Sequence, residues 1–256
     1  MGRLEGKRAI VTGASSGIGR AIANRFAVEG AAVAACGRDS ERLHRTVQEI
    51  RSAGGTAVGL LGDVSTVEGA RSLADGAAHE LGGVDVLINN AGVDASDWHD
   101  LHEWPVEEFD RIVNTNLRGP FLMSKFTLPH LLAAGGGSIV HISSVCAITV
   151  WAGDCGYDIS KAGLNMLSDH IAVEYGARGI RSNTLMPGVI RTELHESVME
   201  AMDDGRAFER ELLSRHPIGR FGSVEECAEA ALFLCEDNAH FLTGANISID
   251  GGYSRV

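Results

Sequence analysis

Short apolar runs alternate with longer amphipathic segments along most of this chain. In the longer segments, apolar residues return at every third or fourth position, as with Ile18, Ile22 and Phe26, which is typical of helices. The short runs have the length of buried strands, and we expect them at residues 8–12, 31–36, 56–61, 84–89, 138–142, 180–186 and 245–249. Because parallel strands need a crossover between them, this alternation predicts a parallel sheet with helices on both faces.

Helices are expected at residues 17–29, 40–53, 65–81, 156–177 and 224–235, with a further helical stretch from Pro105 to the glycines at 136–137. Ser65 and Glu68 have the spacing of a capping box at the start of one of them. After Pro187-Gly188 the pattern is irregular and charged to about Gly222. Since parallel crossovers are right-handed, the favoured α/β fold is a doubly wound Rossmann fold with a seven-stranded sheet, and residues 1–256 form a single domain.

The composition narrows the class of protein. With 45% hydrophobic and 22% charged residues, the 256-residue chain is expected to be globular and not disordered. It has 32 glycines but only 5 prolines, which indicates tight turns between regular elements and argues against a low-complexity linker. The net charge of −12 disfavours nucleic acid and anionic membrane surfaces as partners, because like charges repel.

The five cysteines are odd in number, widely spaced and without a C-x-x-C motif. This pattern argues against a disulfide framework and against a zinc site, so we expect a reducing compartment and no metal. The N-terminal apolar run is short and has no cleavage-like site, and no stretch approaches the roughly 20 apolar residues that cross a bilayer. A cytoplasmic protein is therefore the default expectation.

The segment TGASSGIG, residues 12–19, lies between the first expected strand and the first expected helix. Glycines let backbone amides approach a pyrophosphate closely, and the helix start adds free N–H groups and a positive dipole end. The spacing is G-x-x-x-G-x-G and not the usual G-x-G-x-x-G, and a glycine turn that only connects elements is the alternative. We favour a dinucleotide site whose contacts are Gly13, Ser15, Ser16, Gly17, Ile18 and Gly19.

This segment resembles the cofactor turn of the classical short-chain dehydrogenases/reductases, and the resemblance continues nearly from end to end. The further matching positions are Asp63-Val64, Asn89-Asn90-Ala91-Gly92, Asn116, Ser144, Tyr157-x-x-x-Lys161 and Pro187-Gly188. The resemblance implies that Asp63 and Val64 bind the adenine and that residues 89–92 brace the central sheet. It adds these residues to the cofactor site: Asn90, Ala91, Gly92, Tyr157, Lys161, Pro187, Gly188, Ile190 and Thr192. It also implies a homotetramer, with a dimer as the second expectation.

Tyr157 and Lys161 lie four residues apart in an expected helix and therefore share one face. A free tyrosine has a pKa of about 10, and about 4 kcal/mol of differential stabilisation would bring it toward 7. We expect the lysine ammonium and the oxidised nicotinamide to favour the phenolate, so that Tyr157 acts as the acid/base. By itself, Tyr-x-x-x-Lys is more often a solvated helix face. The resemblance further implies that Lys161 bonds the nicotinamide ribose.

Ser144 ends an expected strand, where its hydroxyl could donate to the substrate oxygen that becomes negative during hydride transfer. Ser143 is chemically equal, but neighbours in a strand point to opposite faces, and the family spacing S-x12-Y selects Ser144. Asn116 matches the family asparagine that kinks its helix and holds a water relaying protons to the lysine. The expected reaction is hydride transfer between a nicotinamide and a carbonyl or secondary alcohol, and the expected catalytic residues are Asn116, Ser144, Tyr157 and Lys161.

The choice between NADP and NAD depends on the end of the second strand. Sites that prefer NAD usually carry an acid there, which bonds the ribose 2′-OH, but this chain has Gly37. Arg38 follows and suits a 2′-phosphate, whereas Asp39 could neutralise Arg38 or take the ribose itself. We expect NADP as the preferred cofactor and leave NAD open.

Family resemblance places the substrate near residues 94–98, 146–155 and 189–216, with a substrate-loop region at about 189–222. We expect the small-molecule substrate to contact Ser144, Trp151, Asp154 and Tyr157. His195 and His216 in this region are more typical of surface or loop histidines than of catalytic ones.

Two other functions stay open. In 3-oxoacyl-acyl-carrier-protein reductases, the acidic carrier needs a basic docking surface. Here LPHLLAAGGG precedes the fifth strand without a basic cluster, and Arg178 alone remains. A non-catalytic nicotinamide-sensing module is favoured less, because such a protein could drop Tyr157 or Lys161 and both are present.

Overall fold

The computed structural model describes residues 2–193 and 205–256. Its centre is one parallel sheet of seven strands in the order β3-β2-β1-β4-β5-β6-β7. The strands are β1 (Arg8–Thr12), β2 (Ala32–Gly37), β3 (Thr56–Leu61), β4 (Val86–Asn89), β5 (Gly137–Ile142), β6 (Ile180–Pro187) and β7 (Asn246–Ile249). The doubly wound Rossmann fold expected from the alternating pattern is therefore confirmed.

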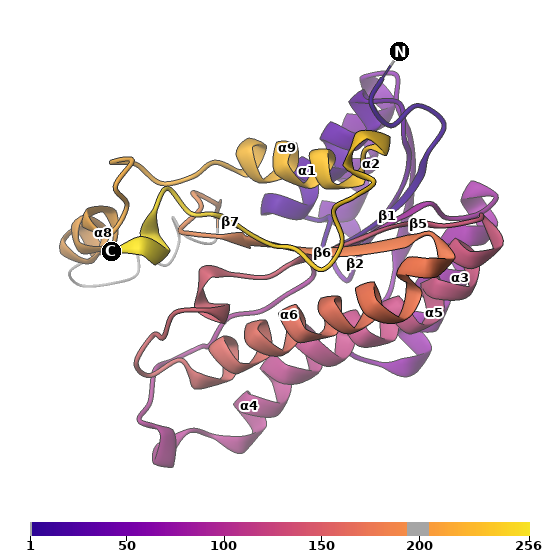
Figure 1. Ribbon diagram of the computed structural model, residues 1–256. Coiled ribbons are helices and arrows are strands. Elements are labelled where there is room, and N and C mark those ends of the chain that lie inside the picture. The colour runs from indigo at the N-terminus through magenta and orange to yellow at the C-terminus, as the bar shows by residue number, and fades with distance from the viewer. Residues whose placement is uncertain (1, 194–204) are drawn as a thin grey trace.

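Helices cover both faces of the sheet (Figure 1). One face carries α1 (Gly17–Val28), α2 (Ser40–Ser52) and α9 (Val224–Cys235), and the other carries α3 (Val67–Leu81), α4 (Val106–Val113), α5 (Gly119–Ala133) and α6 (Cys155–Tyr175). Strand side chains alternate between the two layers: Ala9 and Val11 of β1 join the core under α1 and α9, whereas Ile10 joins the core under α3 and α5. Burial on both sides explains why the strands read as continuous apolar runs.

The strand order reverses between β1 and β4, the central neighbours of the sheet. From β1 the chain winds outward to β2 and β3, and then returns to the centre and winds the other way through β4 to β7. Loops that leave neighbouring carboxyl ends in opposite directions open a crevice at this point. The fold therefore places a binding cleft above β1 and β4.

Two local predictions were wrong. The predicted capping box does not form, because Ser65 instead donates to Asp63 at 2.7 Å and Thr66 caps α3 by accepting from the Gly69 amide at 3.0 Å. The region expected to be irregular contains a helix, α8 (Gly205–Ser214). The helical stretch expected from Pro105 is two helices joined by a π-turn, and the remaining short turns are η1 (Leu101–Glu103), η2 (the π-turn, Asn114–Arg118), η3 (Val145–Ala147), η4 (Gly176–Arg178), η5 (Asp237–Ala239) and η6 (Tyr253–Arg255).

No helix in the described ranges combines the length and the apolar character that a membrane crossing requires.

Candidate active site

A cleft of about 930 Å³ lies along the carboxyl ends of the strands. Its size is that of a site for a small molecule or cofactor. All predicted site residues line this cleft except Gly19 and Asn116, which lie behind it. The prediction therefore named residues that the fold brings together, although they come from seven separate segments of the chain.

The glycine turn is as tight as the sequence suggested. Gly13 and Gly17 have positive φ angles of 66° and 52°, where an L side chain is strained. A Cβ on Gly19 would collide with the carbonyl oxygen of Gly13 and the side-chain amide of Asn90. Asn90 in turn donates to the Thr12 carbonyl at 3.0 Å, which ties the loop after β4 to the turn after β1.

The start of α1 is prepared for an anion. Its first turn has no acidic residue, and the Ser16 side chain makes no capping hydrogen bond. The first N–H groups of the helix are therefore not capped by Ser16 and can donate to a ligand. The buried Ser15 hydroxyl has no hydrogen-bond partner within the described part of the chain. Free amides, an unpartnered hydroxyl and a positive dipole end together fit a pyrophosphate.

Arg38 and Asp63 meet above β2 and β3 at 3.6 Å, with the Arg38 side chain 64% exposed. Burial acts to raise the pKa of Asp63, but hydrogen bonds from Ser65 and the charge of Arg38 outweigh it and lower the pKa. Asp39 accepts from the Arg42 amide at 3.0 Å and so caps α2. The neutralising partner of Arg38 is therefore Asp63 and not the adjacent Asp39.

Helix α6 carries Tyr157 and Lys161 into the middle of the cleft. The Lys161 Nζ lies 5.4 Å from the centre of the Tyr157 ring and donates to the Ile142 carbonyl at 2.9 Å. Burial lowers the pKa of Lys161 to about 8. Ser143 donates to the Lys161 carbonyl at 3.2 Å, whereas the Ser144 hydroxyl hydrogen-bonds to Tyr157. Of the two serines, Ser144 is the one that reaches the tyrosine.

The pKa of Tyr157 departs from the expectation. Burial raises it well above its usual value, and the charges of Asp94 and Cys146 raise it further, whereas the hydrogen bond with Ser144 lowers it. The nearby Lys161 does not lower the pKa of Tyr157 enough to offset the effect of burial. In the protein alone the tyrosine is therefore held as the neutral phenol, ready to donate a proton.

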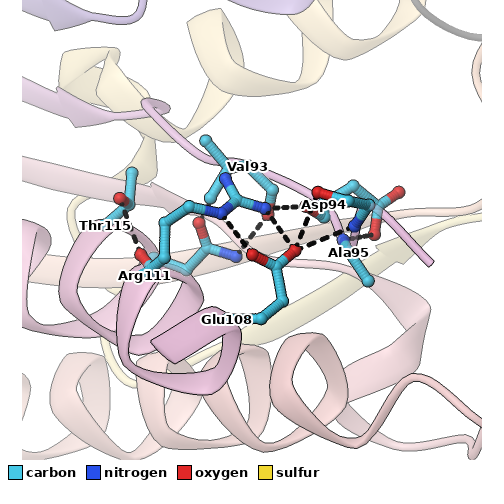
Figure 2. A network of polar contacts seen from close by, with 8 residues as sticks. Val93, Asp94, Ala95, Glu108, Arg111 and Thr115 are labelled. Carbon is cyan, nitrogen blue, oxygen red and sulfur yellow. Dashed lines mark hydrogen bonds and ion pairs between the residues drawn. The ribbon is translucent and has the colours of Figure 1, made fainter. Parts of the chain in front are cut away.

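Asn116 lies in the π-turn η2 and is fully buried. Its side chain accepts from the Val93 amide at 2.8 Å and donates to the Val93 carbonyl at 2.8 Å and to Ser160 at 3.2 Å. The side chain therefore clamps the loop after β4 to α6. Figure 2 shows the same loop held from α4 by Glu108 and Arg111.

The far end of the cleft is lined by residues from three regions. Predicted residues Trp151 and Asp154 are joined there by Phe208 and Leu212 of α8 and by Tyr253 near the C-terminus. Phe208 and Leu212 lie in the range 189–216 that was expected near the substrate, although neither was named, and Tyr253 was missed. Only the four-residue spacing of Phe208 and Leu212 hinted at the helix that brings them into place.

His216 is not a surface histidine. It is buried, and its Nδ1 donates to the Leu212 carbonyl at 2.8 Å while its Nε2 accepts from the Val189 amide at 3.4 Å. The ring thus joins the end of α8 to the segment after β6. His195 lies outside the described residues.

Comparison with known proteins places the chain in a family. Residues 13–254 match the family model described as enoyl-(acyl carrier protein) reductase. The cis-4-hydroxycyclohexanecarboxylate dehydrogenase of Sinomonas cyclohexanicum is 40% identical over 248 residues, which cover 97% of this chain and 96% of that protein.

Solved structures agree with this assignment. A protein from Burkholderia xenovorans assigned to the short-chain dehydrogenases/reductases is 36% identical, with a TM-score of 0.96 and coverage of 100% of this chain and 99% of that one. A protein from Agrobacterium tumefaciens assigned as a 2-deoxy-D-gluconate 3-dehydrogenase, with bound NADP, is 32% identical, with a TM-score of 0.88 and coverage of 98% and 97%. The chain belongs to the short-chain dehydrogenase/reductase family and is an NAD(P)-dependent oxidoreductase.

Proposed function

We propose that this protein transfers hydride between a nicotinamide and a carbonyl or secondary-alcohol substrate, with Tyr157 as the acid/base. The observation that carries the proposal is the convergence of Ser144, Tyr157 and Lys161 in the cleft that begins at the glycine turn. A hydroxyl donor, a proton donor and a buried cation are the groups that a reacting carbon–oxygen bond requires.

The residues divide the work as follows. The Tyr157 phenol donates its proton to the substrate oxygen during reduction, and Ser144 donates a hydrogen bond to the same oxygen as it becomes negative. Lys161 supplies positive charge beside the tyrosine ring, and its pKa of about 8 keeps most of it protonated at neutral pH. The nicotinamide supplies or accepts the hydride when it is bound.

Replacement of Tyr157 by Phe tests this proposal. We expect turnover to fall by a factor of roughly 10²–10⁴, because the proton donor is lost, while cofactor affinity stays within about twofold. Nicotinamide absorbance reports turnover, and fluorescence titration reports cofactor binding. Tyr175→Phe, at the other end of α6, is the matched control and should leave turnover unchanged. Full turnover by Tyr157→Phe would overturn the proposal.

We further propose that NADP is preferred. Arg38 is exposed at the cleft, and its ion pair with Asp63 is long, at 3.6 Å, so the guanidinium can turn toward a 2′-phosphate. A side chain on Gly37 would collide with the Ser15 hydroxyl, which disfavours an acid there. The Agrobacterium tumefaciens protein with bound NADP supports the same reading.

Arg38→Ala should weaken NADPH binding about tenfold, because a charge-assisted contact is lost, and should leave NADH binding nearly unchanged. Arg45→Ala, on the exposed side of α2, is the control. An equal loss for both cofactors would contradict the preference.

A 3-oxoacyl group on an acyl carrier protein is the second candidate substrate, since a relative from Thermotoga maritima that is 36% identical is named a 3-oxoacyl-[acyl-carrier-protein] reductase. A panel of ketones and 3-oxoacyl thioesters, assayed with NADPH and with NADH, separates the two.

We also propose a homotetramer. Apolar side chains of α5 and α6 are exposed on one face of the sheet, and they are Phe121, Ile159, Met166 and Val173. Light scattering coupled to size exclusion measures the mass directly, and a monomer would contradict the proposal.

A further inference from the structure

Two carboxyl groups face each other at the substrate end of the cleft. Asp154 is the N-cap residue of α6 and is only 7% exposed, yet its carboxyl does not cap the helix by the usual side-chain hydrogen bond. Its Oδ1 has no hydrogen-bond partner among residues 2–193 and 205–256. Asp94, from the loop after β4, acts on it both as a charge and through a hydrogen bond between the carboxyls. A buried carboxyl that lines a cleft and has one unpartnered oxygen is poised for a ligand.

The pKa of Asp154 is far above that of an ordinary aspartate. Burial, together with the charges of Asp94 and Asp158, raises the pKa of Asp154 to about 7. The Asp154 carboxyl is therefore partly protonated at neutral pH and can donate a hydrogen bond as well as accept one. The described residues contain no group of three or more His, Cys, Asp or Glu side chains that could hold a metal ion. The pair therefore offers hydrogen bonds and does not form a metal site.

Asp94 is held in place by its main chain (Figure 2). Arg111 donates to the Asp94 carbonyl at 2.6 Å and to Glu108 at 2.7 Å, while Glu108 accepts from the Ser96 amide at 2.9 Å. Asn116 fixes the preceding residue, Val93, from both sides. The position of the carboxyl pair is thus set by α4 and η2, before any ligand arrives.

An aromatic wall, formed by Trp98, Trp151 and Phe208, stands beside the carboxyl pair. Neighbouring ring centres are 5.8 to 6.1 Å apart, which means that the rings contact one another and leave no space for a ligand between them. Trp98 is 47% exposed. The wall can therefore cover one flat apolar face of a substrate but cannot enclose a cation.

A cation beside the wall, Arg215, already has other partners. Arg215 lies 5.5 Å from the Trp151 ring centre, donates to the Tyr253 hydroxyl at 3.2 Å and pairs with Glu211 at 3.5 Å. It is not among the residues that line the cleft. The cation that acts on Asp94 is Lys161, which the reacting centre already uses. A substrate carboxylate at this end would therefore meet Asp94 and Asp154, and the described lining residues supply no further cation beside the pair.

We propose that the Asp94–Asp154 pair selects an uncharged ring substrate with a second hydroxyl near the reacting carbon, whose C–H face packs on the aromatic wall. This inference rests on the proposed function. Asp154 lies three residues before Tyr157, one helical turn away, so its carboxyl and the reacting oxygen are within reach of neighbouring positions on one ring. A hydroxyl donates and accepts at once, which matches a carboxyl that can do both. A substrate that lacks it would leave the buried carboxyl unpaired.

Four ring alcohols test the inference in the oxidising direction: cyclohexanol, cis-1,2-cyclohexanediol, 2-aminocyclohexanol and cis-4-hydroxycyclohexanecarboxylate. We expect kcat/KM for the diol to exceed that for cyclohexanol by at least about tenfold, mostly through KM, with the amine and the carboxylate below the diol. Asp154→Ala should bring the diol down to the level of cyclohexanol. Asp154→Asn should keep most of the preference, because an amide also donates and accepts.

Asp97→Asn, on the same loop but outside the cleft lining, is the matched control and should retain the full preference. Equal kcat/KM for the diol and cyclohexanol, a preference for the amine or the carboxylate, or an Asp154→Ala variant that still prefers the diol would each overturn the inference. Turnover of cyclohexanol without any preference would defeat this inference alone. If no alcohol or ketone is turned over with either cofactor, the proposed function fails instead.

Discussion

The two halves of the cleft differ in the kind of atoms that line them. The half at the glycine turn is made of main-chain atoms at the ends of β1, β2 and β4, and its shape depends on the absence of side chains at Gly13 and Gly19. The half that contains Trp98, Asp154 and Phe208 is made of side chains on loops and on α8. One half is fixed by backbone that the sheet already holds, and the other by contacts between distant segments.

This difference sets what each half tolerates. A substitution in the glycine turn must move backbone that is hydrogen-bonded to neighbouring strands, so its effect is large and falls on cofactor binding. A substitution in the other half changes which groups face the substrate and leaves the strands in place. The scaffold can therefore keep one cofactor site while the substrate site varies.

The largest effect is expected from Gly19→Ala. The new Cβ would collide with the Gly13 carbonyl oxygen and the Asn90 amide, and the resulting strain should weaken cofactor binding about 100-fold. Gly76→Ala, in the middle of α3, is the control, because its Cβ meets only Leu60 at an ordinary 3.7 Å. Fluorescence titration measures both. Unchanged affinity in Gly19→Ala would show that the turn is more pliable than its packing indicates.

An intermediate effect is expected from His141, which lies on β5 beside Asn89 of β4, beneath both halves. The residue is fully buried, and burial, aided by the charge of Lys161, lowers its pKa to about 3. The unfolded chain, with a pKa of about 6.5, binds the extra proton between these values, so stability falls as the pH drops below about 6.5.

This histidine should cost the folded protein about 2 kcal/mol between pH 7.5 and pH 5. His141→Gln should remove that part of the loss, and His79→Gln, on the exposed side of α3, should not. Urea unfolding at the two pH values measures the difference. Equal pH dependence in the wild type and His141→Gln would mean that the ring takes up its proton without unfolding.

The smallest effect is expected from Glu108→Ala, in the half built of side chains. The change frees Ser96 and Arg111 and so loosens the loop that carries Asp94. Because a partly exposed ion pair contributes about 0.2–1 kcal/mol, substrate KM should rise only about threefold, with cofactor affinity unchanged. Glu107→Ala, its exposed neighbour on α4, is the control. A larger effect on cofactor binding than on KM would erase the distinction between the halves.

Most of the fold followed from the sequence because its signals are local. The bounds of β1, β3 and α9 agree with the predicted ranges to the residue, and the other strands differ by one or two residues at an end. The failed capping box shows the limit of local spacing. Ser65 matched the pattern, but the helix begins one residue later, so Thr66 is its cap and the Ser65 hydroxyl donates to Asp63.

The sequence alone determined the parallel sheet, the tight turn at residues 12–19 and the shared face of Tyr157 and Lys161, because periodicity, glycine conformation and helical spacing act over a few residues. Only the tertiary structure decided that burial keeps Tyr157 protonated, that Asp63 is the partner of Arg38 and that Asp154 faces Asp94. Burial and charge pairing depend on which distant segments of the chain come into contact. A local sequence pattern holds no information about those contacts.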